Sequence, residues 1–166
     1  MVLQGCKGFT FLELLFTTSI VVVLGFLGVT GMTSLLQSSS HTTTLQLVIT
    51  TLDRARSLAV MRGRRTAICM TDESWVCTAD WSGENLIVFI DDNKDRKHDS
   101  DEEIIYSQTL TASIQIVWIG ALHYPVISYQ PDGSAVSNGR LELSDKHNDR
   151  WKKTIFISKP GRARIE

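Results

Sequence analysis

A long stretch near the start of this chain has no charged side chain. From Leu14 to Leu52 there is no Asp, Glu, Lys or Arg, and up to Met32 nearly every residue is Leu, Val, Ile, Phe, Gly or Thr. Extended back to Phe9, this run has about 20 or more apolar residues, the length that a helix needs to cross a bilayer. It therefore predicts one transmembrane helix at residues 9–32.

The basic residues around this helix predict its direction across the membrane. Lys7 is the one basic residue before it, and the next ones begin at Arg54. That distance is at or beyond the reach over which flanking charges set topology. We therefore expect the amino terminus to stay cytoplasmic and the rest of the chain to lie on the other side.

The helix is expected to continue beyond the apolar run, because apolar residues recur there at helical spacing. They are Leu45, Val48, Ile49, Leu52, Ala55, Ala59 and Val60. This pattern predicts a helix over residues 9–62 whose outer half packs on a folded domain. From Gly63 onward, short β-prone runs alternate with turn signals. They predict a β-rich domain at 63–166 with strands at 66–71, 74–78, 86–91, 103–108, 114–119, 127–130, 140–144 and 154–158.

The segment before the apolar run carries a specific signature. An acid, Glu13, stands at the apolar edge, and a carboxylate at membrane depth is costly enough to suggest a function. The run from Gly8 through Phe9 to Leu15 resembles the processing signature of type IV pilins and type II secretion pseudopilins. The resemblance implies that a prepilin peptidase removes residues 1–8 as a leader, cuts between Gly8 and Phe9, and methylates the new Phe9 amine. It also implies that Glu13 neutralises the amine of a neighbouring subunit.

This resemblance implies the architecture and the location of the chain. The fold class is α+β, a type IV pilin-like fold in which a long transmembrane and amphipathic helix packs on an antiparallel β-sheet domain. The chain is then anchored in inner membrane lipid with its β-rich domain in the periplasm, and it enters a filament with other pilins after assembly. An exported domain of this kind lies in an oxidising compartment, where Cys69 and Cys77 are expected to form a disulfide across a hairpin. The alternatives, a zinc site or a redox pair, lack further ligands or a tighter spacing.

An acidic run at 91–103 contains an arrangement typical of a calcium loop. Its oxygen-bearing side chains fall at EF-hand positions. They are Asp91, Asn93, Asp95, Asp99 and Glu102. However, Arg96 occupies the position where glycine is expected, and the flanking segments are predicted strands. We therefore expect a solvated acidic hairpin tip and no cofactor, with calcium as the alternative.

Catalytic motifs are not apparent. His41, His98, His123 and His147 show no metal-ligand or triad spacing, and no G-x-S-x-G, H-E-x-x-H or phosphate-binding glycine loop occurs. We expect no enzymatic activity.

The charges are segregated along the chain although the net charge is −1. Residues 53–65 hold five arginines, which are expected to form a solvated helix face with partners in other subunits, and DNA contact is the less favoured alternative. Residues 72–103 hold eleven acids against three bases, and residues 140–166 hold eight bases against four acids. The last region includes Arg150, Lys152, Lys153, Lys159, Arg162 and Arg164.

The final basic residues match the geometry of a phosphate chain. On an extended segment Arg162 and Arg164 point the same way, roughly 6–7 Å apart, and guanidinium groups suit phosphate oxygens. Gly161 leaves room for a backbone to approach a ligand closely. This pattern is consistent with sequence-independent DNA binding, and the alternative is a charged tail without a ligand.

A second resemblance bears on this choice. The region from Cys69 through the acidic turn and Pro131-Asp132-Gly133 to Gly161-Arg162-Ala163-Arg164 resembles the FimT/GspH class of minor pseudopilins. Its FimT branch has a terminal Gly-Arg-x-Arg motif implicated in DNA binding during natural transformation. The resemblance implies a minor type IV pilin that binds double-stranded DNA. The alternative is a structural GspH-like pseudopilin of a type II secretion or type IV pilus system that has no DNA ligand.

Overall fold

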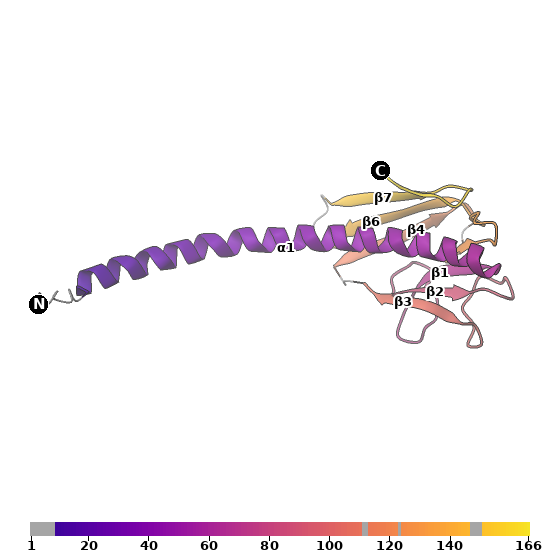
Figure 1. Cartoon of the computed structure of the whole chain (residues 1–166), viewed down its shortest axis with the longest axis horizontal. Coiled ribbons are helices and arrows are strands. Elements are labelled where there is room, and N and C mark those ends of the chain that lie inside the picture. Colours follow the sequence, from indigo (N-terminus) through magenta and orange to yellow (C-terminus); the bar gives the residue numbers. More distant parts are fainter. Residues whose placement is uncertain (1–8, 111–112, 123, 147–150) are drawn as a thin grey trace, which may run out of the picture. The chain divides into compact units, whose positions relative to one another are not determined.

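A computed structural model describes residues 9–110, 113–122, 124–146 and 151–166, and for residues 26–38 it describes the backbone alone. The chain divides into two compact units, one up to Ser40 and one from His41 to Glu166. Helix α1 (Phe11–Arg62) contributes to both units, and every strand lies in the second (Figure 1). The helix begins two residues after the predicted start at residue 9 and ends at the predicted residue 62.

The first unit contains the apolar part of α1. Thr10 caps the helix, because its Oγ1 accepts a hydrogen bond from the Glu13 amide at 3.3 Å. The large apolar side chains of residues 11–24 are exposed in the single chain. Among the residues that the structure describes, no helix is both long and apolar enough to cross a membrane. The span predicted for residues 9–32 stays a prediction, because the side chains of residues 26–32 lie outside the described ones.

The second unit contains two antiparallel four-stranded sheets. The first sheet has the order β3-β2-β1-β5, formed by β1 (Thr66–Thr71), β2 (Asn85–Ile90), β3 (Ile104–Thr109) and β5 (Ile127–Tyr129). The second sheet has the order β4-β6-β7-β8, formed by β4 (Ile114–Gly120), β6 (Gly139–Asp145), β7 (Lys152–Ile157) and β8 (Ala163–Ile165). Gly63 ends α1 with a φ of +63°, a conformation that glycine adopts without strain.

The main core lies between the second half of α1 and the inner faces of both sheets. Val48, Leu52, Ala55 and Ala59 supply the buried stripe of the helix, at the spacing that the sequence predicts. Both sheets supply their inward side chains to the same cluster, including Ile68 and Val88 from the first sheet and Leu141, Leu143, Ile155 and Ile157 from the second. The sequence-based expectation of a helix packed on a β-sheet domain is thus confirmed.

In the first sheet, β1, β2 and β5 are buried on both faces, and β3 is the partly exposed edge strand. Strands β1 and β2 also place Ala67, Cys69, Ile87 and Phe89 in a smaller cluster, against which Cys77 and Ile104 pack. Cys69 and Cys77 form the predicted disulfide, with their Cα atoms 5.6 Å apart. The second sheet differs, because the burial of β6 alternates along the strand and one face stays open to solvent.

The strand predicted at 74–78 is wrong. This segment makes one isolated bridge, from Cys77 to Thr71, and otherwise follows a turn with an irregular path. Asp72 starts a turn in which its Oδ1 accepts hydrogen bonds from the Ser74 amide and hydroxyl, and Trp75 follows with a φ of +62°. A short side chain that binds the backbone two residues on favours a turn over a strand.

Candidate functional site

The open face of the second sheet is the part of the domain on which the basic carboxy-terminal residues lie. Along β7, Ile155 and Ile157 face the core while Phe156 faces solvent. Arg140 of β6 and Arg164 of β8 are the register partners of Phe156 on either side. These three side chains form one row across the sheet, and Ile119 of β4 extends the row next to Arg140.

A turn at residues 158–162 holds the Arg162 backbone in place. We call it the C-terminal turn. The amide and the hydroxyl of Ser158 both donate hydrogen bonds to the Arg162 carbonyl, at 3.0 and 3.1 Å. The Lys159 carbonyl accepts a hydrogen bond from the Ala135 amide at 3.0 Å, which links the turn to the segment before β6. Two backbone anchors therefore fix the position from which Arg162 projects.

Gly161 is buried inside this turn, where it meets the backbone of the chain itself. Its φ is +82°, and a Cβ built on it would lie 2.1 Å from the Gly133 carbonyl oxygen. The same carbonyl accepts a hydrogen bond from Arg56 Nε of α1 at 2.8 Å. The expectation that Gly161 admits a ligand is thus corrected, because the close neighbour is Gly133 rather than a ligand.

Gly133 belongs to the Pro131-Asp132-Gly133 turn that the sequence predicts. Its amide donates to the Gln130 carbonyl at 2.8 Å, and its φ is +79°. Asp132 Oδ1 accepts hydrogen bonds from the Ser134 hydroxyl and amide. These bonds favour the carboxylate, the hydroxyl bond most, and lower the pKa of Asp132 below its ordinary value.

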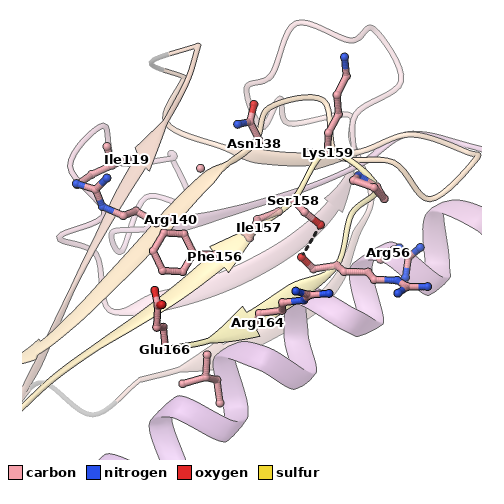
Figure 2. A pocket seen from close by; sticks show the side chains of 14 residues that line it. Arg56, Ile119, Asn138, Arg140, Phe156, Ile157, Ser158, Lys159, Arg164 and Glu166 are labelled. Carbon is pink, nitrogen blue, oxygen red and sulfur yellow. Dashed lines mark hydrogen bonds between the residues drawn. The ribbon is translucent and has the colours of Figure 1, made fainter.

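Five basic side chains line one open groove of about 1080 Å³ between α1, the open sheet face and the C-terminal turn. We call it the basic groove. Its basic residues are Arg56, Arg140, Lys159, Arg162 and Arg164, and Glu166 is its one acidic residue. Figure 2 shows Phe156 between Arg140 and Arg164, with Arg56 beyond Arg164 on the side of α1. Arg162 and Arg164 are both exposed, while Ala163 between them is half-buried.

The structure brings together three of the basic residues that the sequence nominated and separates others. Lys159, Arg162 and Arg164 line the basic groove, whereas Lys152 and Lys153 do not. Those two lysines lie at the far end of β7, about 10–13 Å along the strand from Phe156. Arg150 lies outside the described residues.

Sequence reasoning missed Arg56 and Arg140 as members of this site. Arg140 stands in an unremarkable strand, and only the pairing of β6 with β7 places it next to Phe156. Arg56 is one of the five helix arginines, and its neighbour Gly133 is far away in sequence. The Gly133 turn was the one available sequence signal of the contact with Arg56, because a tight turn allows another segment to approach closely.

The other arginines of residues 53–65 have partners within the same domain. Arg62 pairs with Glu103 at 2.9 Å, Arg64 pairs with Asp92, and Arg65 Nη1 lies 3.8 Å from Asp91. Arg54 stacks over the Tyr106 ring at 4.6 Å. Three of these contacts join the basic end of the helix to the acidic hairpin. The expected role in binding other subunits is therefore not needed to explain these side chains.

The acidic hairpin is held by hydrogen bonds among its own residues. Asn93 Nδ2 donates to Asp99 at 2.8 Å, Asp95 accepts from the Lys97 amide at 2.8 Å, and Glu102 accepts from the Asp92 amide at 3.1 Å. Asp91 is fully buried, and burial raises its pKa, as it does for Glu102. Within the described ranges, no group of three or more His, Cys, Asp or Glu side chains is placed to hold a metal ion. Calcium binding by this hairpin stays the alternative to the predicted solvated tip.

At the amino-terminal site, Phe9 and Glu13 are exposed, and Gly8 lies outside the described residues. Glu13 lies in the first turn of α1, where a carboxylate interacts favourably with the helix dipole. The processing site predicted from the sequence remains a prediction.

The arrangement of one long helix and an antiparallel β domain is the fold of type IV pilin-like proteins. Crystal structures of the type IV minor pilin FimU of Pseudomonas aeruginosa strain PAO1 align with TM-scores of 0.55 and 0.57 at 14% identity. In the first, the alignment covers 75% of this chain and 91% of FimU. The minor pseudopilin EpsH from the type II secretion system of Vibrio cholerae aligns with a TM-score of 0.51 at 13% identity, over 73% of this chain and 91% of EpsH.

The sequence model of the family described as type II transport protein GspH matches residues 44–161. Because this range covers well over half of the chain, the protein belongs to the GspH family. The matched range ends at Gly161, just before Arg162 and Arg164. No curated protein sequence matches the chain.

Proposed function

We propose that this protein is a minor type IV pilin of the FimT kind that binds double-stranded DNA through the basic groove during DNA uptake. The observation that carries the proposal is the convergence of five basic side chains from four separate segments on one open groove with one acid. None of these five side chains projects from the acidic hairpin. A site of this composition attracts a polyanion locally although the chain as a whole is close to neutral.

The form of the groove suits phosphate rather than a specific base sequence. Arginine guanidinium groups bind phosphate oxygens with two parallel hydrogen bonds, and four of the five basic residues are arginines. A few such contacts give weak and strongly salt-dependent binding. Several copies of the protein in one filament would strengthen it through multivalency.

Membership in the GspH family and the pilin-like fold support assembly with other pilins. In this proposal, prepilin peptidase cleaves between Gly8 and Phe9, the apolar part of α1 anchors the chain in the inner membrane, and the β domain lies in the periplasm until assembly. The exposed apolar side chains of residues 11–24 require either lipid or neighbouring helices to cover them. Both surroundings exist for a membrane-anchored pilin.

The test is a titration of the protein with labelled duplex DNA of several unrelated sequences, followed by fluorescence anisotropy at rising salt. We expect binding that does not depend on sequence and weakens steeply with salt. Arg162→Ala and Arg164→Ala should each weaken binding to every duplex and reduce the slope of log affinity against log salt by about one. Lys153→Ala is the matched control, because this exposed lysine lies outside the basic groove.

Absence of duplex binding at low salt would refute the DNA proposal. The chain would then be a structural pseudopilin without a DNA ligand, and the basic groove would serve contacts with other subunits. An equal loss of affinity in Lys153→Ala would also count against the groove, since it would show that any nearby positive charge has the same effect.

A further inference from the structure

Phe156 is an aromatic side chain on the solvent face of an interior strand. The outward positions of β7 are Lys152, Thr154 and Phe156, and 40% of the Phe156 side chain is exposed. The inward positions Ile155 and Ile157 already fill the core below it. The ring therefore contributes little to the packed interior, and neither the fold nor phosphate binding accounts for it.

The neighbours of the ring are two arginines on adjacent strands. Arg140 and Arg164 are its direct register partners, one on each side. The Arg140 guanidinium donates to Glu142 at 2.6 Å. In the described part of the chain, arginine stacking is recorded over the Tyr106 and Tyr124 rings, and neither Arg140 nor Arg164 covers the Phe156 ring. The ring is thus flanked by two guanidinium groups, of which that of Arg140 is paired with Glu142, and it is still open to a flat ligand.

An exposed aromatic ring on an interior strand of an open antiparallel sheet, with basic residues on the adjacent strands, is an arrangement suited to single-stranded nucleic acids. The ring stacks on a base, while the cations hold the phosphates on either side. Duplex DNA presents the same phosphates, but its base faces are covered by neighbouring base pairs. Only a strand with unpaired bases can therefore use both parts of this surface.

We propose that Phe156 is a base-stacking platform of the basic groove, and that Arg140 and Arg164 hold the phosphates beside the stacked base. The preferred ligand of the groove is then single-stranded DNA or the unpaired end of a duplex, bound without regard to sequence. This inference rests on the proposed DNA-binding function and makes it more specific. It predicts that the groove prefers single-stranded DNA to duplex DNA because of base stacking, a preference for which a purely electrostatic groove gives no reason.

The test compares three DNA ligands of equal length and label. They are a single-stranded oligothymidylate, an abasic strand that keeps the phosphates but lacks the bases, and a duplex. The full chain is titrated with each in a non-ionic detergent at low salt, and affinity is measured by fluorescence anisotropy. The native protein should bind oligothymidylate more tightly than the other two. Phe156→Leu should lower the affinity for oligothymidylate about tenfold and leave the abasic strand and the duplex unchanged.

Two further variants separate stacking from other effects of the substitution. Phe156→Trp keeps an aromatic face and should retain the preference for oligothymidylate. Trp75→Leu removes an aromatic ring outside the basic groove that is 43% exposed, against 40% for Phe156, and it should change none of the three affinities. Circular dichroism of each variant checks that the fold is retained.

The outcomes distinguish this inference from the proposal on which it rests. If the native protein binds all three ligands equally, or if Phe156→Leu weakens all three by the same factor, the stacking platform is wrong while DNA binding stands. If Phe156→Leu leaves DNA binding intact but impairs assembly with other pilins, the exposed ring is a protein contact and the inference is also overturned. If no ligand binds at low salt, both proposals fail.

Discussion

Gly161 shows how a single residue positions the basic groove. Two conditions meet there: a φ of +82°, which residues with a Cβ rarely adopt, and contact with the Gly133 carbonyl. The contact joins the C-terminal turn to the turn at 131–133 and to Arg56. The glycine of the Gly-Arg-x-Arg motif therefore acts on the arginines through the backbone, by fixing the turn from which they project.

This role predicts a difference between two glycine substitutions. Gly161→Ala should lower the free energy of unfolding by about 3 kcal/mol, because it adds backbone strain and a clash that only a shift of the turn can relieve. Gly133→Ala is the matched control. Its φ is +79°, but the nearest atom to a new Cβ is a Val60 side-chain carbon at 3.1 Å. The free energy of unfolding should therefore fall by only about 1–2 kcal/mol. Urea denaturation measures both.

The same pair tests the link to binding. Gly161→Ala should weaken duplex binding although Arg162 and Arg164 are still present, because the turn must move. Equal destabilisation by both alanines, or unchanged duplex affinity in Gly161→Ala, would show that the turn does not organise the groove.

For the individual residues of the basic groove, the sequence revealed the residue types but not their neighbours in the fold. The alternation of Arg162 and Arg164 predicted that both side chains point the same way, and in the structure both are exposed on either side of the half-buried Ala163. It could not reveal Arg140, because that neighbour depends on which strand pairs with β7 and in what register. Glycine at 161 indicated a close approach, and the identity of the approaching group depended on a turn 28 positions earlier in the chain.

Helices and strands with a strong apolar periodicity were predictable from the sequence. Segments whose conformation depends on side-chain hydrogen bonds or a disulfide were not. The apolar stripe of α1 and the strands at 66–71, 114–120 and 127–129 lie within a residue or so of their predicted bounds. The segment at 74–78 has apolar residues too, but the Asp72 turn and the disulfide hold it in a loop. β8 was not predicted, because its three residues include a single large apolar side chain, Ile165, and it pairs along the edge of β7.

The junction of helix and second sheet contains a buried polar contact that the sequence did not predict. His41 Nε2 lies 2.5 Å from Asp145 Oδ2 at the end of β6, and both side chains are almost fully buried. The Trp151 ring stacks on the imidazole with centroids 4.3 Å apart. The contact fixes where α1 meets the sheet. If either element moved alone, the imidazole and the carboxylate would separate while both remained buried away from water.

Removing one partner of this contact should destabilise the domain strongly. His41→Ala is expected to lower the free energy of unfolding by about 3 kcal/mol, because it leaves a buried carboxylate without its imidazole partner and opens space beneath Trp151. Gln46→Ala, an exposed change one turn further along α1, should cost less than about 0.5 kcal/mol. Denaturant titration of a fragment starting at Gln37 provides the comparison. Similar values for the two variants would mean that the pair contributes no net stability.

Across the whole molecule, the segregated charges of the sequence have two different outcomes. The basic end of α1 and the acidic hairpin pair with each other within the second unit, so most of their charge is balanced internally. The excess of basic residues near the carboxy terminus does not face a comparable acidic segment. Among the described residues that line the basic groove, Glu166 is the single acid. The groove therefore keeps a local positive charge in a chain whose net charge is −1.

Because the chain has two compact units, we predict that a substitution in one unit can abolish assembly without affecting DNA binding. Glu13 belongs to the first unit and the basic groove to the second. In the proposed function, the Glu13 carboxylate compensates the amino-terminal ammonium of a neighbouring subunit inside the filament. The domain from His41 onward has its own core and needs no part of this interaction.

Glu13→Ala should therefore abolish incorporation into filaments and leave duplex affinity unchanged. Without the carboxylate, the ammonium of the neighbouring subunit enters a low-dielectric environment unpaired, at a cost of several kcal/mol. Immunoblotting of the sheared filament fraction measures incorporation, and anisotropy with the detergent-solubilised chain measures binding. Glu73→Ala, an exposed acid of the second unit, is the control and should assemble normally. Normal assembly of Glu13→Ala would remove this carboxylate from the mechanism, and a parallel loss of DNA binding would show that the two activities are coupled through the fold.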